Sequence, residues 1–505
     1  MYRVTNTIQQ HPLGVFAAFL AVHAVVWTAL PAIFFRNLPL DLIEALLYGR
    51  EWQLGYDKLP PLPWWMVEAA YRLFGVDLAY YALSQIAVVA AFALVWHMGR
   101  QLVGPAAALV AVFIIDGLHY FTFTAPKFNH DVIQLPFWAL TGYAYWAALR
   151  HGRTLHWVLL GVGAGMAFWA KYFVVVQLAP LVLFALLDRE ARKVLLTPGP
   201  WIAAIVALAI MAPHLIWLVR NDFLPFAYAD ARAVHFKGPL DYLIKPPKFL
   251  LSQLGFLLPS LLIAAPYLRR DPSAPAKADA EASADAFDRR IVTLLAFGPA
   301  LTVVLMSLVT GRDAVPLWGY PLWLFLGLWI VQNARPIGTI TLWRMTVLWG
   351  AIFVCTAAAF VYEYGVSQYF KPHAVAVMFP GDKLGVEMSR RYRAMTGKPL
   401  SYVIGAMWEG GNIAHYSPDH PRVLIDGKPS RAPWIDLGDL RARGAVVVWP
   451  GNDTKAIPPQ YRAMADDAEI QGSFTLPYRI GAGTVDISWA LLRPRPVVAG
   501  ATPAP

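Results

Sequence analysis

The side chains best suited to chemistry crowd into one segment, Leu40 to Trp65, with the sequence LDLIEALLYGREWQLGYDKLPPLPWW. The segment follows a long apolar run and holds Asp41, Glu44 and Lys58. If its first half is helical, Asp41 and Glu44 are three residues apart and share one helix face. The residue before a proline avoids the helical region, so the LPP sequence is expected to be extended, with Lys58 projecting toward the carboxylates.

Two interpretations of this segment stay open from the residues alone. The charges belong to a reaction site, or they are solvated on a pair of helices along the membrane interface, where tryptophan is common. Asp41 is also well placed to satisfy free amides at a helix start. Glu51 and Asp57 are expected to be solvated in either case.

A second candidate group lies in the sequence FTAPKFNHDVIQLPFW, where His130 and Asp131 stand at the start of an apolar run. An ionisable side chain at the edge of a membrane span is a functional candidate. The alternative is structural, because Asn129 or Asp131 is a good helix N-cap. His130 alone is more often a hydrogen-bonded residue of a helix start than a metal ligand.

Cationic side chains form a third group. Lys171 lies within the apolar sequence GMAFWAKYFVVV, where a cation must find a partner or reach an interface. Arg312 and Trp318 belong to the short sequence TGRDAVPLWGYP. Basic groups that converge at one end of a helix bundle would hold a phosphate, and arginine does so with two parallel hydrogen bonds.

The motifs of soluble enzymes are missing from the sequence. It contains no P-loop, no GxGxxG between strand and helix, no HExxH and no GxSxG. It also lacks the DxD pair with which nucleotide-sugar enzymes hold a metal, so a nucleotide sugar is not expected as donor. The single cysteine, Cys355, excludes a disulfide within the chain and a cluster of thiolate metal ligands.

The composition is that of an integral membrane protein. Of 505 residues, 58% are hydrophobic and 15% are charged, and the mean hydropathy is +0.47, whereas soluble domains carry about 25% charged residues. Apolar runs predict about eleven spans. The first run, near 13–35, is interpreted as a retained helix rather than a cleaved signal. The net charge of +10 suits anionic lipid surfaces and needs no nucleic acid.

The fold class predicted is a polytopic α-helical membrane domain followed by a small α/β domain. Residues 1–364 form the membrane domain, with a first outer loop over about 36–78. Residues 365–495 change to short β-branched runs separated by turns. The Ala/Asp-rich sequence over 269–290 is expected to be a linker, and 496–505 a disordered tail. Basic loop residues favour a cytoplasmic N-terminus and an extracytoplasmic α/β domain.

The order of these segments resembles the membrane-embedded GT-C glycosyltransferases of family 39, which include the protein O-mannosyltransferases and the aminoarabinose transferase that modifies lipid A. The family's first outer loop reads Asp-Glu, an aromatic-rich helix, then Gly-Tyr, Lys or His, and Pro-Pro-Leu. GYDKLPPL (Gly55–Leu62) is similar to its second half. Later family segments resemble KFNHDVIQLPFWAL, GVGAGMAFWAKYFVVV, LVRNDFLPFAYADARA and VPLWGYPLW, so the resemblance covers residues 10–360.

Two positions depart from the family pattern. The acid that follows the first aspartate is Leu42 here, with Glu44 two places later, and Lys58 stands one residue further from the prolines. The resemblance therefore carries over to Asp41 more firmly than to Glu44 or Lys58.

The resemblance implies an inverting glycosyltransferase that moves a sugar from a polyprenyl-phosphate-linked donor to an acceptor at the outer face of the membrane. Asp41 would take the proton of the acceptor hydroxyl, and Asp131 would position the acceptor or hold Asp41. Lys58, with Lys171 or Arg312, would stabilise the departing phosphate. The remaining expected site residues are Glu44, Tyr56, His130 and Trp318.

No cofactor or metal is required by this mechanism, although relatives with pyrophosphate donors use a divalent cation. The acceptor stays open among lipid A, another glycolipid, a glycan and a protein. A bacterial inner membrane is expected from the short inner tail and the lack of retention signals. The C-terminal domain is then periplasmic.

Two other classes of protein compete with this interpretation. A lipid or sugar transporter or flippase would carry ionisable residues at mid-membrane depth and interrupted helices in two related halves. The acids of this chain are expected on the outer side, and its sequence shows no two-half symmetry. A scaffold protein that acts through its C-terminal domain would leave Leu40–Trp65 without a function.

Overall fold

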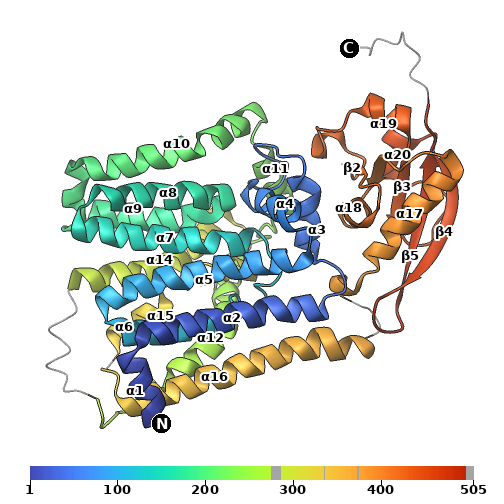
Figure 1. The fold of residues 1–505 in the computed structure, drawn as a ribbon. Helices are drawn as coiled ribbons and strands as arrows, with labels where there is room; N and C mark the ends of the chain where they lie inside the picture. The colour runs from blue at the N-terminus through green and yellow to red at the C-terminus, as the bar shows by residue number, and fades with distance from the viewer. Residues whose placement is uncertain (275–285, 335, 372–374, 496–505) are drawn as a thin grey trace. The chain divides into compact units, whose positions relative to one another are not determined.

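The computed structural model describes residues 1–274, 286–334, 336–371 and 375–495 (Figure 1). The chain forms two compact units, each made of segments that are distant in sequence. Unit 1 consists of Met1–Ala32, Lys58–Pro63 and Leu78–Phe360, and unit 2 of Ile33–Asp57, Trp64–Asp77 and Val361–Pro505.

This division differs from the predicted boundary between 364 and 365. Most of the first outer loop belongs to the same unit as the C-terminal domain, and only Lys58–Pro63 belongs with the helix bundle. Residues 275–285 of the expected linker and the expected tail, 496–505, lie outside the described residues.

Unit 1 is a helix bundle in which long helices run side by side (Figure 1). Each of the apolar runs found in the sequence contains a helix. The helices are α1 (Tyr2–Gln10), α2 (Pro12–Phe34), α5 (Asp77–Leu102), α6 (Pro105–Asp116), α7 (His130–His151), α8 (Thr154–Ala170), α9 (Val175–Leu187), α10 (Pro198–Arg220), α11 (Leu224–Arg232), α12 (Pro239–Ala264), α14 (Ala286–Thr310), α15 (Leu326–Asn333) and α16 (Thr339–Val361).

The outer surface of the bundle is suited to lipid. On α10, Trp201, Ile205 and Leu208 are all more than half exposed, which a water-soluble protein would avoid over a whole helix. Among the described residues, six helices are long and apolar enough to cross a membrane. The predicted multi-span helical fold is therefore confirmed, while the count of about eleven spans stays a prediction.

The chain breaks at Lys171 between two helices. α8 ends at Ala170, Lys171 is extended with φ −164° and ψ 135°, and a short 3₁₀ turn over Tyr172–Val174 leads into α9. The apolar runs on either side of Lys171 are thus two separate helices, and the lysine occupies the connection.

A buried polar cluster joins three helices of the bundle. His23 of α2 lies with its Nδ1 2.7 Å from Oδ1 of Asp116 at the end of α6, and both side chains are almost fully buried. Trp349 of α16 donates its indole N–H to the other carboxylate oxygen of Asp116 at 2.6 Å. Phe19 and Phe92 pack on the His23 ring. Because an unpaired carboxylate in such surroundings is very costly, the close approach of His23 and the hydrogen bond from Trp349 hold Asp116 and link the three helices.

Unit 2 contains a five-stranded sheet in the order β2-β1-β3-β5-β4. β1 pairs in parallel with β2 and β3, whereas β5 pairs antiparallel with β3 and β4. The strands are β1 (Tyr402–Gly405), β2 (Arg422–Ile425), β3 (Ala445–Pro450), β4 (Glu469–Pro477) and β5 (Thr484–Leu492). All five correspond to the β-branched runs in the sequence, so the predicted strands are confirmed.

The sequence explains the positions of β3 and β4 in the sheet. β3 reads AVVVWP and is buried over its first five residues, as expected for a central strand covered on both faces. β4 alternates between exposed and half-buried residues and forms an edge. The helices around the sheet are α17 (Gly381–Thr396), α18 (Met407–Tyr416), α19 (Leu437–Arg443) and α20 (Pro459–Ala465).

The first outer loop supplies two further helices to unit 2, α3 (Leu40–Gly49) and the greater part of α4 (Leu62–Phe74). A non-helical segment with the two prolines separates them, and it bends at residues 57–59 and 61. The candidate aspartate Asp41 is therefore carried by the unit that contains the sheet.

The His23–Asp116 pair gives a stability prediction. Asp116→Leu leaves the buried His23 ring without its carboxylate, so the free energy of unfolding is expected to fall by about 3–5 kcal/mol. The double variant His23→Phe/Asp116→Leu removes both polar partners from an aromatic site and should recover much of this loss. The measurement is the midpoint of thermal unfolding in detergent, and an Asp116→Leu protein as stable as the wild type would contradict the assignment.

Candidate active site

Asp41 is presented near the start of α3. It is the second residue of the helix, behind Pro39 at the N-cap position, and its side chain is partly exposed. The positive end of the helix dipole favours a negative charge in this turn. Glu44 follows one turn later and is only 4% exposed. The two acids that the sequence pairs therefore differ in access, and Asp41 is the more accessible one.

The position of α3 is set by α18. Leu42, Ile43 and Leu46 are buried, and Gly411 of α18 lies so close that a Cβ atom there would be 2.6 Å from Ile43 Cγ2. The backbone N–H of Leu38 donates to the hydroxyl of Tyr416 at 3.2 Å. Close apolar packing and this bond hold the first turn of α3 on the C-terminal domain.

Asp57 is not solvated, as was expected from the sequence, but buried. It is 7% exposed, and its carboxylate accepts hydrogen bonds from the hydroxyl of Tyr48 at 3.0 Å and from Nε of Arg431 at 2.8 Å. Arg431 also donates to the Tyr48 hydroxyl at 3.0 Å and pairs with Asp426. Burial, reinforced by Asp57, raises the pKa of Tyr48 well above its usual value, so Tyr48 keeps the proton that it donates.

Glu51 is likewise paired rather than solvated. Its carboxylate accepts from Nε of Arg422 at 3.2 Å and from a terminal nitrogen of the same guanidinium. The sequence did not indicate that Glu51 and Asp57 are paired, because their arginine partners lie about 370 residues further along the chain.

Tyr56, expected to contact substrate, is 1% exposed. Its hydroxyl donates to the backbone carbonyl of Tyr48 at 2.8 Å and accepts from the N–H of Gln53 at 3.1 Å. Its ring packs edge-on against Trp64 and Trp434. These contacts shape the turn that follows α3, and they give Tyr56 a structural role within unit 2.

In unit 1, Asp131 and Lys171 form an ion pair at the start of α7. The distance from Lys171 Nζ to Asp131 Oδ1 is 2.6 Å, and Gln134 donates to the same oxygen at 3.0 Å. Asn129 is the N-cap, since its Oδ1 accepts from the backbone N–H of Asp131 and of Val132. The cap and the candidate acid are therefore different residues, which leaves the Asp131 carboxylate to hold the lysine at the break between α8 and α9.

The segment with Lys58 joins the same cluster through His130. The ring Nε2 of His130 donates to the carbonyl of Pro60 at 3.0 Å, and the ring is 6% exposed. Lys58 and Lys171 both lie within electrostatic range of this ring. Lys58 Nζ is also 6.0 Å from the ring centre of Tyr228 on α11.

Trp318 and Arg312 reach different partners. Lys171 Nζ lies 5.7 Å from the ring centre of Phe173, and the ring of Trp318 lies 5.6 Å from that of Phe173. Trp318 is thus one aromatic ring away from the lysine. Arg312 instead forms an ion pair with Asp230, which follows Tyr228 by two residues on α11.

The structure therefore brings Lys58, His130, Asp131, Lys171 and Trp318 together in unit 1, and it places Asp41, Glu44 and Tyr56 in unit 2. Arg312 lies in unit 1 but pairs away from Lys171. Sequence reasoning missed several contacts of these residues, namely those made by Gln134, Phe173, Tyr228 and Asp230.

Two of the missed residues carried a local signal. Gln134 is three residues after Asp131, the helical spacing at which side chains meet, and Phe173 is two residues after Lys171. Tyr228 and Asp230 reach their partners only through the tertiary fold. Among the described residues, no group of three or more His, Cys, Asp or Glu side chains is arranged to hold a metal ion. Metal independence stays a prediction.

Comparison with known proteins finds similar glycosyltransferases. The profile of the dolichyl-phosphate-mannose-protein mannosyltransferase family matches residues 58–217. The lipopolysaccharide core galacturonosyltransferase RgtA of Rhizobium johnstonii is 25% identical over 530 residues, which cover 97% of this chain and 99% of that protein. The undecaprenyl phosphate-alpha-4-amino-4-deoxy-L-arabinose arabinosyl transferase of Pseudomonas paraeruginosa is 28% identical over 46% of each chain.

Among solved structures, ArnT of Cupriavidus metallidurans bound to undecaprenyl phosphate has a TM-score of 0.59. The match covers 97% of this chain and 99% of that one at 14% identity. The fold of this chain is therefore the ArnT-like GT-C fold of multi-pass membrane proteins. The expected resemblance is confirmed: the chain is a glycosyltransferase similar to RgtA and to the ArnT enzymes.

The buried pair of Asp57 and Arg431 gives a prediction for the support of α3. Arg431→Met leaves the Asp57 carboxylate buried without its cation, which is expected to lower the stability of unit 2 by about 3–5 kcal/mol. Hydrogen–deuterium exchange should show faster exchange of the amides in α3. Arg390→Met is the control, because Arg390 is largely exposed and its partner Glu387 is also bound by Arg391. Equal exchange in the two variants would refute the assignment.

Proposed function

We propose that this protein transfers a sugar from a polyprenyl-phosphate-linked donor to a lipid A or lipopolysaccharide-type saccharide at the outer face of a bacterial inner membrane. The names of the relatives support both substrate classes, since they include lipopolysaccharide and lipid A galacturonosyltransferases and transferases that use an undecaprenyl phosphate sugar. On this proposal the N-terminus is cytoplasmic and the C-terminal domain is periplasmic.

The observation that carries the proposal is the pair of lysines at the start of α7. Lys171 is held by Asp131 at 2.6 Å, and the Lys58 segment is held by His130 through Pro60. Lys58 and Lys171 both lie within electrostatic range of His130, the first residue of α7, and the start of a helix is also its positive end. Such a site stabilises the charge that grows on a departing phosphate, and it needs no reorganisation when the bond breaks.

The reaction is a direct displacement in this proposal. The oxygen of the acceptor hydroxyl attacks the anomeric carbon while the bond from that carbon to the phosphate oxygen breaks. The bonding electron pair leaves with the polyprenyl phosphate, and the hydroxyl proton passes to Asp41. A single displacement inverts the anomeric centre. Asp131 acts as a positioning residue for Lys171 rather than as the base, because its carboxylate is already engaged.

Partial exposure and a first-turn position suit Asp41 to the role of base. The positive end of the helix favours a negative charge at this position, and the partial exposure of Asp41 leaves room for an acceptor hydroxyl. Glu44 is buried, so it would act on Asp41 or on the packing of α3 instead of on the acceptor.

Removal of the proposed base gives a kinetic prediction. Asp41→Asn should lower kcat for sugar transfer by about 10²–10⁴-fold, the usual loss for a general base, with little change in folding. The measurement uses purified protein in nanodiscs with a polyprenyl-phosphate sugar and lipid A. The matched control is Asp241→Asn, since Asp241 is also a partly exposed aspartate in the first turn of a helix, α12. Near-normal transfer by Asp41→Asn would remove Asp41 from the mechanism.

The same preparation separates the enzyme from a transporter. In sealed vesicles a flippase moves the lipid-linked sugar without forming a product, whereas the proposed enzyme forms product in detergent as well. Movement of the donor without transfer would contradict the proposal.

The lysine of the helix break gives a second kinetic prediction. Lys171→Gln should lower kcat by about 10²–10³-fold, the cost of removing a group that stabilises charge in the transition state. Lys245→Gln is the control, because Lys245 is another partly buried lysine in an ion pair, at 2.9 Å from Asp313. If both variants lose activity equally, Lys171 has no special role at the phosphate.

A further inference from the structure

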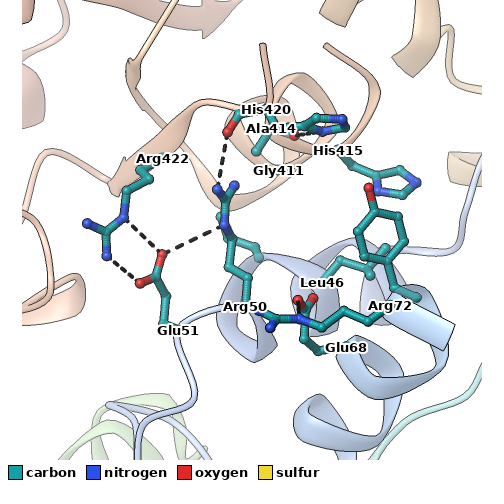
Figure 2. A pocket seen from close by; sticks show the side chains of 12 residues that line it. Leu46, Arg50, Glu51, Glu68, Arg72, Gly411, Ala414, His415, His420 and Arg422 are labelled. Carbon is teal, nitrogen blue, oxygen red and sulfur yellow. Dashed lines mark hydrogen bonds and ion pairs between the residues drawn. The ribbon is translucent and has the colours of Figure 1, made fainter. Parts of the chain in front are cut away.

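Unit 2 contains a charged pocket that the proposed reaction does not use. It has a volume of about 500 Å³ and lies between the loop helices and the start of β2 (Figure 2). α3 supplies Leu46 and Arg50, α4 supplies Glu68 and Arg72, and α18 and the turn after it supply His415 and His420. Arg422, at the first position of β2, and Glu51 close one side.

The pocket carries more positive than negative charge. Three arginines face two glutamates, which leaves one positive charge before the histidines are considered. Burial lowers the pKa of His415 to about 4, and nearby His420 adds to this effect. His415 is therefore a neutral imidazole at neutral pH, able to donate one hydrogen bond and accept another.

The two signs of charge differ in exposure. The side chains of Glu51 and Glu68 are only 9% and 5% exposed, whereas those of Arg50, Arg422 and Arg72 are 28%, 37% and 59% exposed. Glu51 lies between Arg422 and Arg50 and pairs with both, and Glu68 lies beside Arg72 (Figure 2). What a ligand meets in this pocket is therefore guanidinium rather than carboxylate.

The hydrogen bonds leave donor capacity on the arginines. Glu68 engages Nε of Arg72 at 2.7 Å, and within the described part of the chain the two terminal nitrogens of Arg72 have no hydrogen-bond partner. Arg50 gives its terminal nitrogens to the carbonyls of Pro421 and His420. Burial and the neighbouring Arg422 lower the pKa of Arg50, since the other groups only partly compensate its charge. An anion in the pocket would relieve this repulsion.

We propose that this pocket binds an oxyanion carried by a saccharide, with a phosphate monoester as the probe that defines the class. The two terminal nitrogens of Arg72 donate hydrogen bonds to the oxyanion, and Arg422 and Arg50 supply further positive charge. His415 contacts the sugar that carries the oxyanion. The link to the acceptor rests on the proposed function, under which lipid A is the molecule that brings the phosphate. The binding of an oxyanion does not depend on that function.

The first experiment measures equilibrium binding without a sugar donor. The full-length protein in nanodiscs is titrated with lipid A and with phosphatase-treated lipid A. Arg72→Gln should weaken the binding of lipid A about tenfold, the effect of one charged hydrogen bond. Phosphatase-treated lipid A should bind the wild type and Arg72→Gln equally weakly. The matched control, Arg390→Gln, is similarly exposed and similarly paired with a glutamate on its own helix.

A second variant guards against loss of the fold. Arg422→Lys keeps a cation beside Glu51 but removes the planar fork, and it should also weaken lipid A binding while the protein stays monodisperse. Equal lipid A affinity in Arg72→Gln, Arg422→Lys and Arg390→Gln overturns the proposal. Competition by inorganic phosphate in the wild type assigns the site to the phosphate group alone. Lack of competition, with lipid A binding still dependent on Arg72, assigns it to the phosphate together with its saccharide.

Turnover separates this proposal from the proposed function. With a polyprenyl-phosphate sugar as donor, Arg72→Gln should raise the KM for lipid A about tenfold and leave kcat and the KM for the donor unchanged. If the wild type forms no product while lipid A binding depends on Arg72, the proposed function is contradicted and the proposed oxyanion site is supported. If product forms normally and Arg72→Gln behaves like Arg390→Gln with lipid A, the pocket proposal fails alone.

Discussion

Charge in a lipid-embedded bundle must be paired or placed where a helix ends, and most polar features of unit 1 follow from this constraint. Lys171 stands at the connection between two helices and is neutralised by Asp131. Asp116 stands at the end of α6 and is bound by His23 and Trp349. The first arrangement leaves its cation beside the start of α7, whereas the second is almost fully buried, with Phe19 and Phe92 against the His23 ring. The need to pair buried charge therefore accounts both for the Lys171–Asp131 pair, which is suited to chemistry, and for the structural cluster around Asp116.

Charged side chains of unit 2 are also paired where they are buried. Asp57 and Glu51 are covered because α3 packs on the C-terminal domain, and each finds an arginine from that domain. These pairs anchor the segment that follows the end of α3, since Glu51 and Asp57 both lie beyond Gly49. Asp41 lies on the same helix, so the packing that places α3 also places Asp41.

The spacing of apolar and β-branched residues predicted those helices and strands that depend on neighbouring residues in the sequence. The β-branched runs became the five strands, and residues 40–49 form the helix considered for the first half of Leu40–Trp65. The functional importance of the start of α7 was also predicted, because an ionisable residue beside an apolar run is a strong signal of a site. Pairing across about 370 residues was not foreseeable, so Asp57 and Glu51 were wrongly expected to be solvated. His23 and Asp116 carried the same signal as Lys171 and were overlooked, since each is a single polar residue in a long apolar run.

The chain passes from one compact unit to the other five times, at residues 32/33, 57/58, 63/64, 77/78 and 360/361. A cut after the last helix of the bundle would therefore not release a natural domain. The excised C-terminal piece would lack α3 and α4, and the close-packed surface of α18 around Gly411 would be open to solvent. Truncation after α16 is therefore unsuited to isolating the sheet, whereas substitutions at surface positions of the sheet leave both units with all their segments.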